Sequence, residues 1–389
     1  MRVQVVIIGG GPSGLLLAQL LHNAGIDALV LERKTRDYVL SRIRAGVLER
    51  GLVDLLDEAG VAQRLRQESF THDGTVMAAS QDYFHIPFSK YIDKPVTVYG
   101  QTELTRDLYE ARERCGARTL FNVENVAIHD LDTKSPRVEC LSVSGPVNIH
   151  CDYVVGCDGF HGVSRQHIPL TIRREYEKVY PFGWLGILSE TPPVHDELIY
   201  ANSERGFALC SMRNDKLSRY YIQCAVDESL EQWCDQAFWD ELRRRIPERF
   251  ADSIETGPSI EKSIAPLRSF VCEPMQWQRL FLCGDAAHIV PPTGAKGLNT
   301  AASDVFYLWQ ALLSHYKDND HFRLDSYSQT ALARVWKVER FSWWMTSMLH
   351  RFPEHSAFDL KIQLAELAFL RHSEEAQASL AINYVGLPY

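Results

Sequence analysis

A glycine-rich run close to the start of the chain, Gly9–Gly14, has the spacing of a phosphate-binding loop. It reads Gly-Gly-Gly-Pro-Ser-Gly and fits GxGxxG between an apolar stretch of strand length and an amphipathic helix. In this pattern the first glycine (Gly9) allows a tight turn, the second (Gly11) lets the backbone approach a pyrophosphate, and the third (Gly14) lets the helix pack on the strand. Glu32, at the end of the second predicted strand, could bind ribose hydroxyls. The run predicts a dinucleotide site without separating FAD from NAD.

Two further motifs place a carboxylate at the end of a buried strand. Asp158 lies in the run Cys157–Arg165, and Asp285 lies in Gly284–His288. Each carboxylate could accept hydrogen bonds from sugar or ribitol hydroxyls. Beyond Asp285, the glycines within residues 294–297 and a helix start near Asn299 would offer backbone N–H groups to an anion. Three motifs in this order favour FAD as the dinucleotide.

A different set of side chains could bind an aromatic acid. Ser211 and Arg213 are two residues apart on a predicted strand, so their side chains share one face of a sheet. A guanidinium can hold both oxygens of a carboxylate, and a neighbouring hydroxyl adds a donor. Tyr221, on the predicted return strand, could add a third. Taken alone, each of the three is better explained as part of a sheet surface.

The elements that would position these groups form an α/β protein with a discontinuous nucleotide-binding domain. Residues 3–8, 12–22 and 28–31 predict a βαβ unit. Residues 185–226 predict an inserted antiparallel sheet, and the chain beyond Asn299 has mostly helical periodicity. We therefore expect a Rossmann-like FAD-binding domain over 1–72, 97–180 and 269–300, a substrate-binding β-sheet domain over 73–96 and 181–268, and a helical C-terminal or interface region over 301–389.

The composition is that of an ordinary globular protein of 389 residues with a formal net charge of −9. This charge argues against general binding to nucleic acid or to anionic membranes. The nine cysteines show no CxxC spacing, and no His/Cys/Asp/Glu grouping predicts a metal site. There is no signal-peptide pattern at the N-terminus. We expect reduced thiols, no metal, no membrane association and a cytoplasmic location.

The motifs taken together resemble those of the group A aromatic-ring flavoprotein hydroxylases. The resemblance is carried by the three dinucleotide motifs and by the runs 42–49, 180–186, 285–299 and 383–389. It extends over essentially the whole chain and is weakest in 77–95 and 133–148. The resemblance implies that FAD is held by Ser13, Glu32, Arg42, Arg44, Gln101 and Asp285, with Leu298 and Asn299 at the pyrimidine edge of the flavin.

The same resemblance implies a substrate pocket and a route for a proton. Tyr200 would hydrogen-bond the phenol of the substrate, with Tyr384 behind it and His72 at the water end of the relay. Pro292, through its carbonyl, and Thr293 would also face the substrate, whose carboxylate would bind Ser211, Arg213 and Tyr221. NADPH would bind across a cleft at Arg44, His161 and Arg268. The basic stretch after the second strand could hold its 2′-phosphate through Arg33, Lys34 and Tyr38.

The implied reaction converts 4-hydroxybenzoate, NADPH and O2 into 3,4-dihydroxybenzoate, NADP and water through a C4a-hydroperoxyflavin, in a homodimer. NADH remains possible as the reductant. One alternative is a related FAD hydroxylase that acts on another phenolic or amino benzoate. A second alternative, from a different class, is a flavin-binding regulator or electron carrier without oxygenase turnover. Substrate-stimulated NADPH oxidation distinguishes this last possibility from an enzyme.

Overall fold

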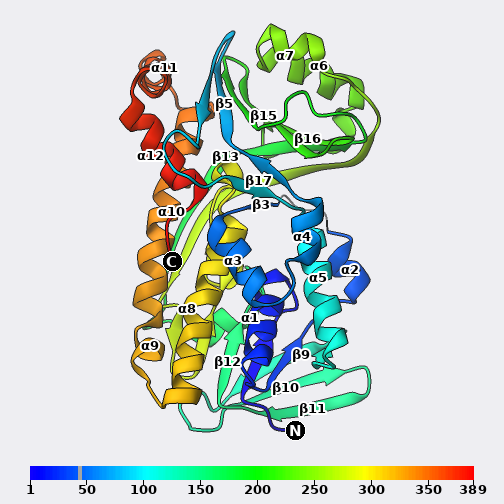
Figure 1. Ribbon diagram of the computed structural model, residues 1–389, viewed down its shortest axis with the longest axis vertical. Helices are drawn as coiled ribbons and strands as arrows, with labels where there is room; N and C mark the ends of the chain where they lie inside the picture. Colours follow the sequence, from blue (N-terminus) through cyan, green and yellow to red (C-terminus); the bar gives the residue numbers. More distant parts are fainter. Residues whose placement is uncertain (43–45) are drawn as a thin grey trace.

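The computed structural model describes residues 1–42 and 46–389 (Figure 1). Its first layer is a six-stranded sheet in the order β18-β19-β12-β1-β2-β8. Neighbouring strands are parallel except for the β18–β19 pair. The strands are β1 (Val5–Ile8), β2 (Ala28–Leu31), β8 (Thr119–Leu120), β12 (Tyr153–Gly156), β18 (Gln276–Trp277) and β19 (Leu280–Leu282). They come from three separate stretches of chain, so this part of the fold is discontinuous in sequence, as expected.

The central strands of this sheet are apolar because helices cover them. All four residues of β1 are buried, as parallel strands usually are. The covering helices include α1 (Pro12–Asn23), α5 (Gln101–Arg114) and α8 (Gly297–Asp318), and α1 contacts the other two. Two three-stranded sheets flank this layer: β9 (Glu124–His129), β10 (Arg137–Ser142) and β11 (Gly145–His150) form one, and β3 (Val47–Leu48), β7 (Val96–Val98) and β4 (Phe70–His72) form the other.

The second layer is an eight-stranded sheet in the order β20-β17-β13-β16-β15-β14-β5-β6. Its strands are β5 (Gly74–Ala79), β6 (Asp82–Pro87), β13 (Arg174–Ser189), β14 (Ile199–Ser203), β15 (Gly206–Asn214), β16 (Leu217–Cys224), β17 (Ser259–Glu273) and β20 (His288–Ile289). Helices α6 (Asp235–Arg245) and α7 (Glu248–Ser253) lie at the outer end of the molecule, at the top of Figure 1. Phe238, Trp239 and Phe250 of these helices share a hydrophobic core with the sheet.

The structure confirms the α/β class with an inserted sheet, and it corrects one detail. The sheet is not antiparallel throughout, because β14 pairs with β5 in parallel. β5 comes from a distant stretch of chain and is not joined to β14 by a hairpin, so a parallel pairing is sterically available. The domain limits proposed at 180/181 and 268/269 fall inside β13 and β17, which pair along most of their length.

The C-terminal region is helical. After α8 come α9 (Phe322–Asp325), α10 (Tyr327–Leu349), α11 (Ala357–His372) and α12 (Glu374–Val385). α10 runs along one side of the molecule in Figure 1 and contacts β14, β17 and the turn Pro292–Gly294. The remaining helices are α2 (Arg36–Leu40), α3 (Arg50–Glu58) and α4 (Gln63–Glu68), with short 3₁₀ turns at 164–167, 230–232, 284–286 and 292–294. None of the helices in the described ranges is long and apolar enough to span a membrane.

Candidate active site

One cavity of about 430 Å³ connects the glycine-rich loop with the eight-stranded sheet. At one end it is lined by Gly11 and Ser13, and at the other end it reaches strands β14, β15 and β16. Pockets of this size between layers of an α/β fold commonly bind small molecules and cofactors. Many of the residues predicted from the sequence line this cavity: Gly11, Ser13, Gln101, Asp285, Leu298, Tyr200, Ser211, Arg213, Tyr221 and Pro292.

The glycine-rich loop can be formed only by glycine at two of its positions. Gly9 has φ +111°, and a Cβ there would lie 2.2 Å from the carbonyl oxygen of Cys157. A Cβ on Gly14 would lie 2.1 Å from the carbonyl oxygen of Gly9. In contrast, the Cβ position of Gly11 meets no atom within 4 Å, and Gly11 lines the cavity. The loop is therefore packed tightly on its protein side and open on its cavity side, which is what a bound pyrophosphate requires.

Glu32 lies directly beside this loop. Its Oε2 accepts a hydrogen bond from the Gly10 N–H at 2.7 Å, and its Oε1 accepts one from the Lys34 N–H at 2.8 Å. The Tyr109 hydroxyl donates to the Gly10 carbonyl at 2.6 Å and holds the other side of the loop. Glu32 is thus fixed at the end of β2, where an acidic side chain can reach ribose hydroxyls.

The two carboxylates of the later motifs differ in their surroundings. Asp285 lines the cavity. Asp158 instead accepts hydrogen bonds from the Ser164 N–H and hydroxyl, both at 2.9 Å. Burial raises the pKa of Asp158, and the bonds from Ser164 oppose this rise. Asp158 therefore shapes its own turn, whereas its neighbours Cys157 and Gly159 line the cavity.

The N-terminus of α8 forms the middle of the cavity wall, where Gly297 and Leu298 line it. The Asn299 side chain accepts from the Glu49 N–H at 2.9 Å and donates to the Val47 carbonyl at 2.9 Å. Its hydrogen bonds therefore connect β3 to α8, whose first two residues line the cavity. Arg42 is exposed and its guanidinium lies over the Tyr38 ring. Arg44 lies outside the described residues.

The cation at the far end of the cavity, Arg213, has no acidic partner in the part of the chain that the structure describes. The Nη1 of Arg213 donates to the Ser211 hydroxyl at 2.8 Å, and its Nε is buried without a hydrogen-bond partner. None of the ion pairs among residues 1–42 and 46–389 involves Arg213. Burial lowers the pKa of Arg213, and Tyr221 opposes this effect. A charge removed from water without a counter-ion is costly, so an anion at this end of the cavity would be stabilised.

Tyr221 is held in place by groups that the sequence did not reveal as functional. The Arg219 guanidinium lies 5.1 Å from the centre of the Tyr221 ring, and it pairs with Glu261 at 3.0 Å. On the neighbouring strand, a Cβ at Gly186 would lie 2.6 Å from the Tyr221 ring. The two-residue spacing of Arg219 and Tyr221 on one strand was the available signal that their side chains share a face.

Tyr200 and Tyr384 form a buried pair. Their hydroxyl oxygens are 2.8 Å apart, although the residues are 184 positions apart in the chain. Burial, together with Tyr384, raises the pKa of Tyr200 well above its usual value. Burial raises the pKa of Tyr384 to about 12, despite the hydrogen bond to Tyr200. Both hydroxyls therefore stay protonated near neutral pH. A proton can cross the pair only if the hydroxyl that donates the hydrogen bond becomes the one that accepts it.

His72 ends β4 and is buried, and neither ring nitrogen has a hydrogen-bond partner among residues 1–42 and 46–389. Burial lowers the pKa of His72 to about 4, and Asp196 opposes this effect. The ring is therefore neutral near pH 7, and its nitrogens can bind water. Thr293 is also fully buried, but its hydroxyl bonds to that of Thr346 on α10 at 2.8 Å. Pro292 lines the cavity, whereas the Thr293 side chain turns toward α10.

Apart from Arg44, which lies outside the described residues, the residues predicted for NADPH lie at the surface in two groups. In one, the Lys34 ammonium lies 5.2 Å from the centre of the half-exposed Tyr38 ring, beside the exposed Arg33. In the other, the Arg268 guanidinium lies 4.6 Å from the centre of the Phe160 ring, and Phe160 contacts the exposed His161. Arg268 also pairs with Glu177 at 3.0 Å.

Several cavity residues carried no signal in the sequence. Lys296 is buried, and its ammonium donates to Glu49 at 2.6 Å and to the Tyr384 carbonyl at 2.7 Å. Burial lowers the pKa of Lys296, and Glu49 opposes this effect. Apolar side chains complete the wall: Val47, Trp184, Leu198, Leu209 and Val290. Buried apolar residues on strands are too common for their types to identify a pocket.

The fold and the cavity define a flavoprotein, and comparison with known proteins agrees. Residues 2–342 match the family model described as FAD binding domain. The chain is 53% identical to p-hydroxybenzoate hydroxylase of Acinetobacter baylyi, over all of this chain and 96% of that protein. It is 27% identical to para-nitrophenol 4-monooxygenase of Pseudomonas sp., over 83% of this chain and 81% of that one. The chain therefore belongs to the group A FAD-dependent aromatic-ring hydroxylases, and it is an FAD-dependent aromatic monooxygenase.

Solved structures show how widely this fold is used. The p-nitrophenol 4-monooxygenase of Pseudomonas putida superposes with a TM-score of 0.83 at 17% identity, covering 100% of both chains. A Diels-Alderase of pyrroindomycin biosynthesis superposes with a TM-score of 0.78 at 23% identity, covering 99% of this chain and 80% of that one. Because one fold carries such different reactions, the substrate must be argued from the side chains of the cavity.

Proposed function

We propose that the enzyme converts 4-hydroxybenzoate, NADPH, a proton and O2 into 3,4-dihydroxybenzoate, NADP⁺ and water. The observation that carries the proposal is the cavity lined by both Arg213, which has no acidic partner among the described residues, and the buried Tyr200. A substrate with a carboxylate and a phenol would satisfy both groups. The 53% identical relative, whose name is p-hydroxybenzoate hydroxylase, supports this choice of substrate.

The carboxylate end of the cavity would position the substrate. The Arg213 fork and the Ser211 hydroxyl offer donors for both carboxylate oxygens. Arg219 beneath the Tyr221 ring fixes the third donor. The apolar walls exclude water from the ring, which protects reactive oxygen species on the enzyme from unproductive decay.

The tyrosine pair would activate the substrate. The phenol proton passes to Tyr200 as Tyr200 passes its own proton to Tyr384 and Tyr384 releases its own proton toward water, so neither tyrosine is left ionised. A neutral His72, whose two nitrogens have no partner in the described part of the chain, is suited to exchange that proton with solvent through water. The developing phenolate makes the ring carbon next to the oxygen more nucleophilic. Proton transfer of this kind typically contributes ~10²–10⁴-fold to a rate.

The residues at the other end of the cavity fit FAD. Gly9, Gly11 and Gly14 give a loop open only toward the cavity, and Ser13, Glu32, Gln101 and Asp285 are proposed to bind the dinucleotide beside it. The N-terminus of α8 at Leu298, together with the Lys296 ammonium, would stabilise negative charge at the pyrimidine edge. When bound, FAD supplies hydride acceptance and oxygen activation.

NADPH and the homodimer rest on separate observations. Arg33, Lys34 and Tyr38 present two cations and an exposed ring beside Glu32, which suits a 2′-phosphate. The exposed His161 and the partly exposed Arg268 offer a second group. For the dimer, α11 carries three exposed apolar side chains at helical spacing, Phe358, Ile362 and Phe369, which a second copy of the chain would cover. Sedimentation of the holoenzyme measures this mass directly.

The substrate is tested by NADPH oxidation and oxygen uptake with a panel of aromatic compounds. We expect 4-hydroxybenzoate to stimulate NADPH oxidation at least tenfold. Benzoate lacks the phenol and 4-hydroxybenzyl alcohol lacks the carboxylate, so both should stimulate weakly. Stronger stimulation by 4-aminobenzoate or 3-hydroxybenzoate would move the assignment to that compound. A lack of stimulation by every compound would favour a flavin-binding protein without turnover and contradict the proposal.

A further inference from the structure

The last turn of α10 and the residue after it bind one wall of the substrate cavity. Trp184, on β13, lines the cavity. Its indole N–H donates to the Nε2 of His350 at 2.7 Å, and the Nδ1 of His350 lies 3.0 Å from the Thr346 carbonyl. Because Nε2 accepts a hydrogen bond, the ring proton must sit on Nδ1 and be donated to Thr346. Both side chains are buried, and burial lowers the pKa of His350 to about 3, so this neutral tautomer persists across the physiological range.

The His350 ring is also part of an aromatic stack behind the cavity. It is parallel to the Phe182 ring at 4.7 Å and lies 4.3 Å from the Phe207 ring. Trp184 stacks on Phe207 at 4.9 Å, and its ring also contacts those of His350 at 5.8 Å and Tyr221 at 5.1 Å. Trp184 therefore lies between the stack that contains His350 and a proposed donor to the substrate carboxylate.

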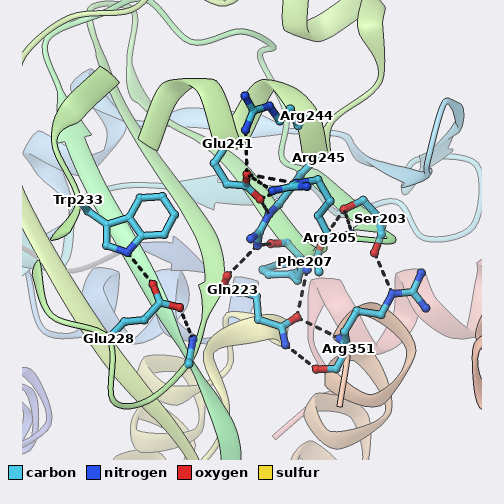
Figure 2. Close-up of polar contacts among 12 residues, drawn as sticks. Ser203, Arg205, Phe207, Gln223, Glu228, Trp233, Glu241, Arg244, Arg245 and Arg351 are labelled. Carbon is cyan, nitrogen blue, oxygen red and sulfur yellow. Dashed lines mark hydrogen bonds and ion pairs between the residues drawn. The ribbon is translucent and has the colours of Figure 1, made fainter. Parts of the chain in front are cut away.

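Three further hydrogen bonds connect the same end of α10 to the other walls. The Thr346 hydroxyl bonds to that of Thr293, the residue after the cavity-lining Pro292. Arg351 donates to the Asn202 side chain at 3.0 Å and to the Ser203 carbonyl at 2.8 Å, and both residues lie on the strand that carries Tyr200. Figure 2 shows Arg351 reaching Ser203 on one side and Gln223 on the other.

We infer that His350 is a positioning residue for the aromatic substrate, because its hydrogen bond holds the Trp184 indole as a fixed wall against Tyr221. An indole N–H buried without an acceptor is unfavourable. Without His350, the indole would rotate to find another partner, and the cavity is the side with free space. The inference rests on the proposed function for the identity of the substrate, but not for the contact between Trp184 and His350.

The test compares His350→Leu with His350→Gln in the FAD-bound enzyme. Both variants lose the imidazole ring, but only glutamine retains an acceptor near the position of Nε2. We expect His350→Leu to weaken 4-hydroxybenzoate binding about tenfold and to lower the product formed per NADPH at least twofold. His350→Gln should stay within about twofold of wild type in both. His355→Leu, which removes a histidine of the same segment that does not contact Trp184, serves as the matched control and should change neither.

A double-mutant cycle with Trp184→Phe separates this contact from general packing. In the Trp184→Phe background the donor is absent, so His350→Leu should cost less than twofold in binding. Equal losses for the leucine and glutamine variants, or a full tenfold loss in the Trp184→Phe background, would overturn the inference. If His350→Leu does not retain FAD, Trp184→Phe alone must reproduce the loss of product formed per NADPH. An unchanged amount of product per NADPH in Trp184→Phe would then overturn the inference.

A spectroscopic measurement is independent of the substrate. In enzyme labelled with 5-fluorotryptophan, Trp184→Phe identifies the fluorine resonance of Trp184. We expect His350→Leu to shift or broaden that resonance and His350→Gln to preserve it, both without substrate. An unchanged resonance in His350→Leu would overturn the inference. Failure of the wild-type enzyme to bind 4-hydroxybenzoate would instead contradict the proposed function, while this spectrum would still decide the role of His350.

Discussion

Arg213→Ala should weaken 4-hydroxybenzoate binding about 100- to 1000-fold while the FAD content of the enzyme stays unchanged. The reason is that Arg213 is the cation in the cavity without an acidic partner among the described residues, and its Nε is buried without a hydrogen bond. Truncating one partner of a buried, hydrogen-bonded charge pair typically costs ~2–5 kcal/mol. Titration of the flavin absorbance with substrate measures the dissociation constant.

Two variants at this end of the cavity serve as controls. Arg213→Lys keeps the charge but not the two-pronged geometry, so its loss should be intermediate. Ser211→Ala removes one donor and should cost roughly five- to tenfold, in line with about 1 kcal/mol for a single hydrogen bond. Binding of 4-hydroxybenzoate by Arg213→Ala with wild-type affinity would show that the carboxylate lies elsewhere.

Tyr200→Phe should reduce the rate of hydroxylation about 100- to 1000-fold and change substrate affinity less than tenfold. The variant keeps the ring and the packing of the pocket, but it removes the hydroxyl that lies 2.8 Å from that of Tyr384. The phenol then has no route for its proton, and a relay of this kind contributes ~10²–10⁴-fold. Rapid-mixing measurements of product formation after oxygen is added give the rate.

The contribution of the second tyrosine to the proton relay can be tested separately. Tyr384→Phe leaves the Tyr200 hydroxyl in contact with the substrate but removes its partner, so hydroxylation should again fall while binding is preserved. In both variants NADPH oxidation should continue and yield mainly hydrogen peroxide. Efficient hydroxylation by Tyr200→Phe would mean that the phenol loses its proton by a path that does not include the pair.

The parts of the site that depend on backbone conformation or strand periodicity were predictable from sequence. Gly9 is required by a positive φ, and at both Gly9 and Gly14 a Cβ would lie about 2 Å from a carbonyl oxygen, so residue type alone reveals the loop. Ser211 and Arg213 share a face because side chains alternate along a strand. The 2.8 Å bond between them confirms that this spacing brings the two groups together.

The parts that depend on long-range packing were not predictable. Trp184 and His350 are 166 positions apart, and Lys296 reaches Glu49 across 247 positions. Nothing local to these residues indicates their partners. Neighbours in the chain can also face different ways: Pro292 lines the cavity, whereas the hydroxyl of Thr293 bonds to Thr346 on α10. The direction of a side chain in a turn depends on the helix packed against it.

The proposed reaction is tested most directly by following one oxygen atom. The purified enzyme is given 4-hydroxybenzoate and NADPH under ¹⁸O2, and the product is identified by chromatography and mass spectrometry. The account predicts one 3,4-dihydroxybenzoate per NADPH consumed, with a single ¹⁸O in the new hydroxyl group. Oxidation of NADPH that yields only hydrogen peroxide, or a hydroxylated product without ¹⁸O, would contradict it.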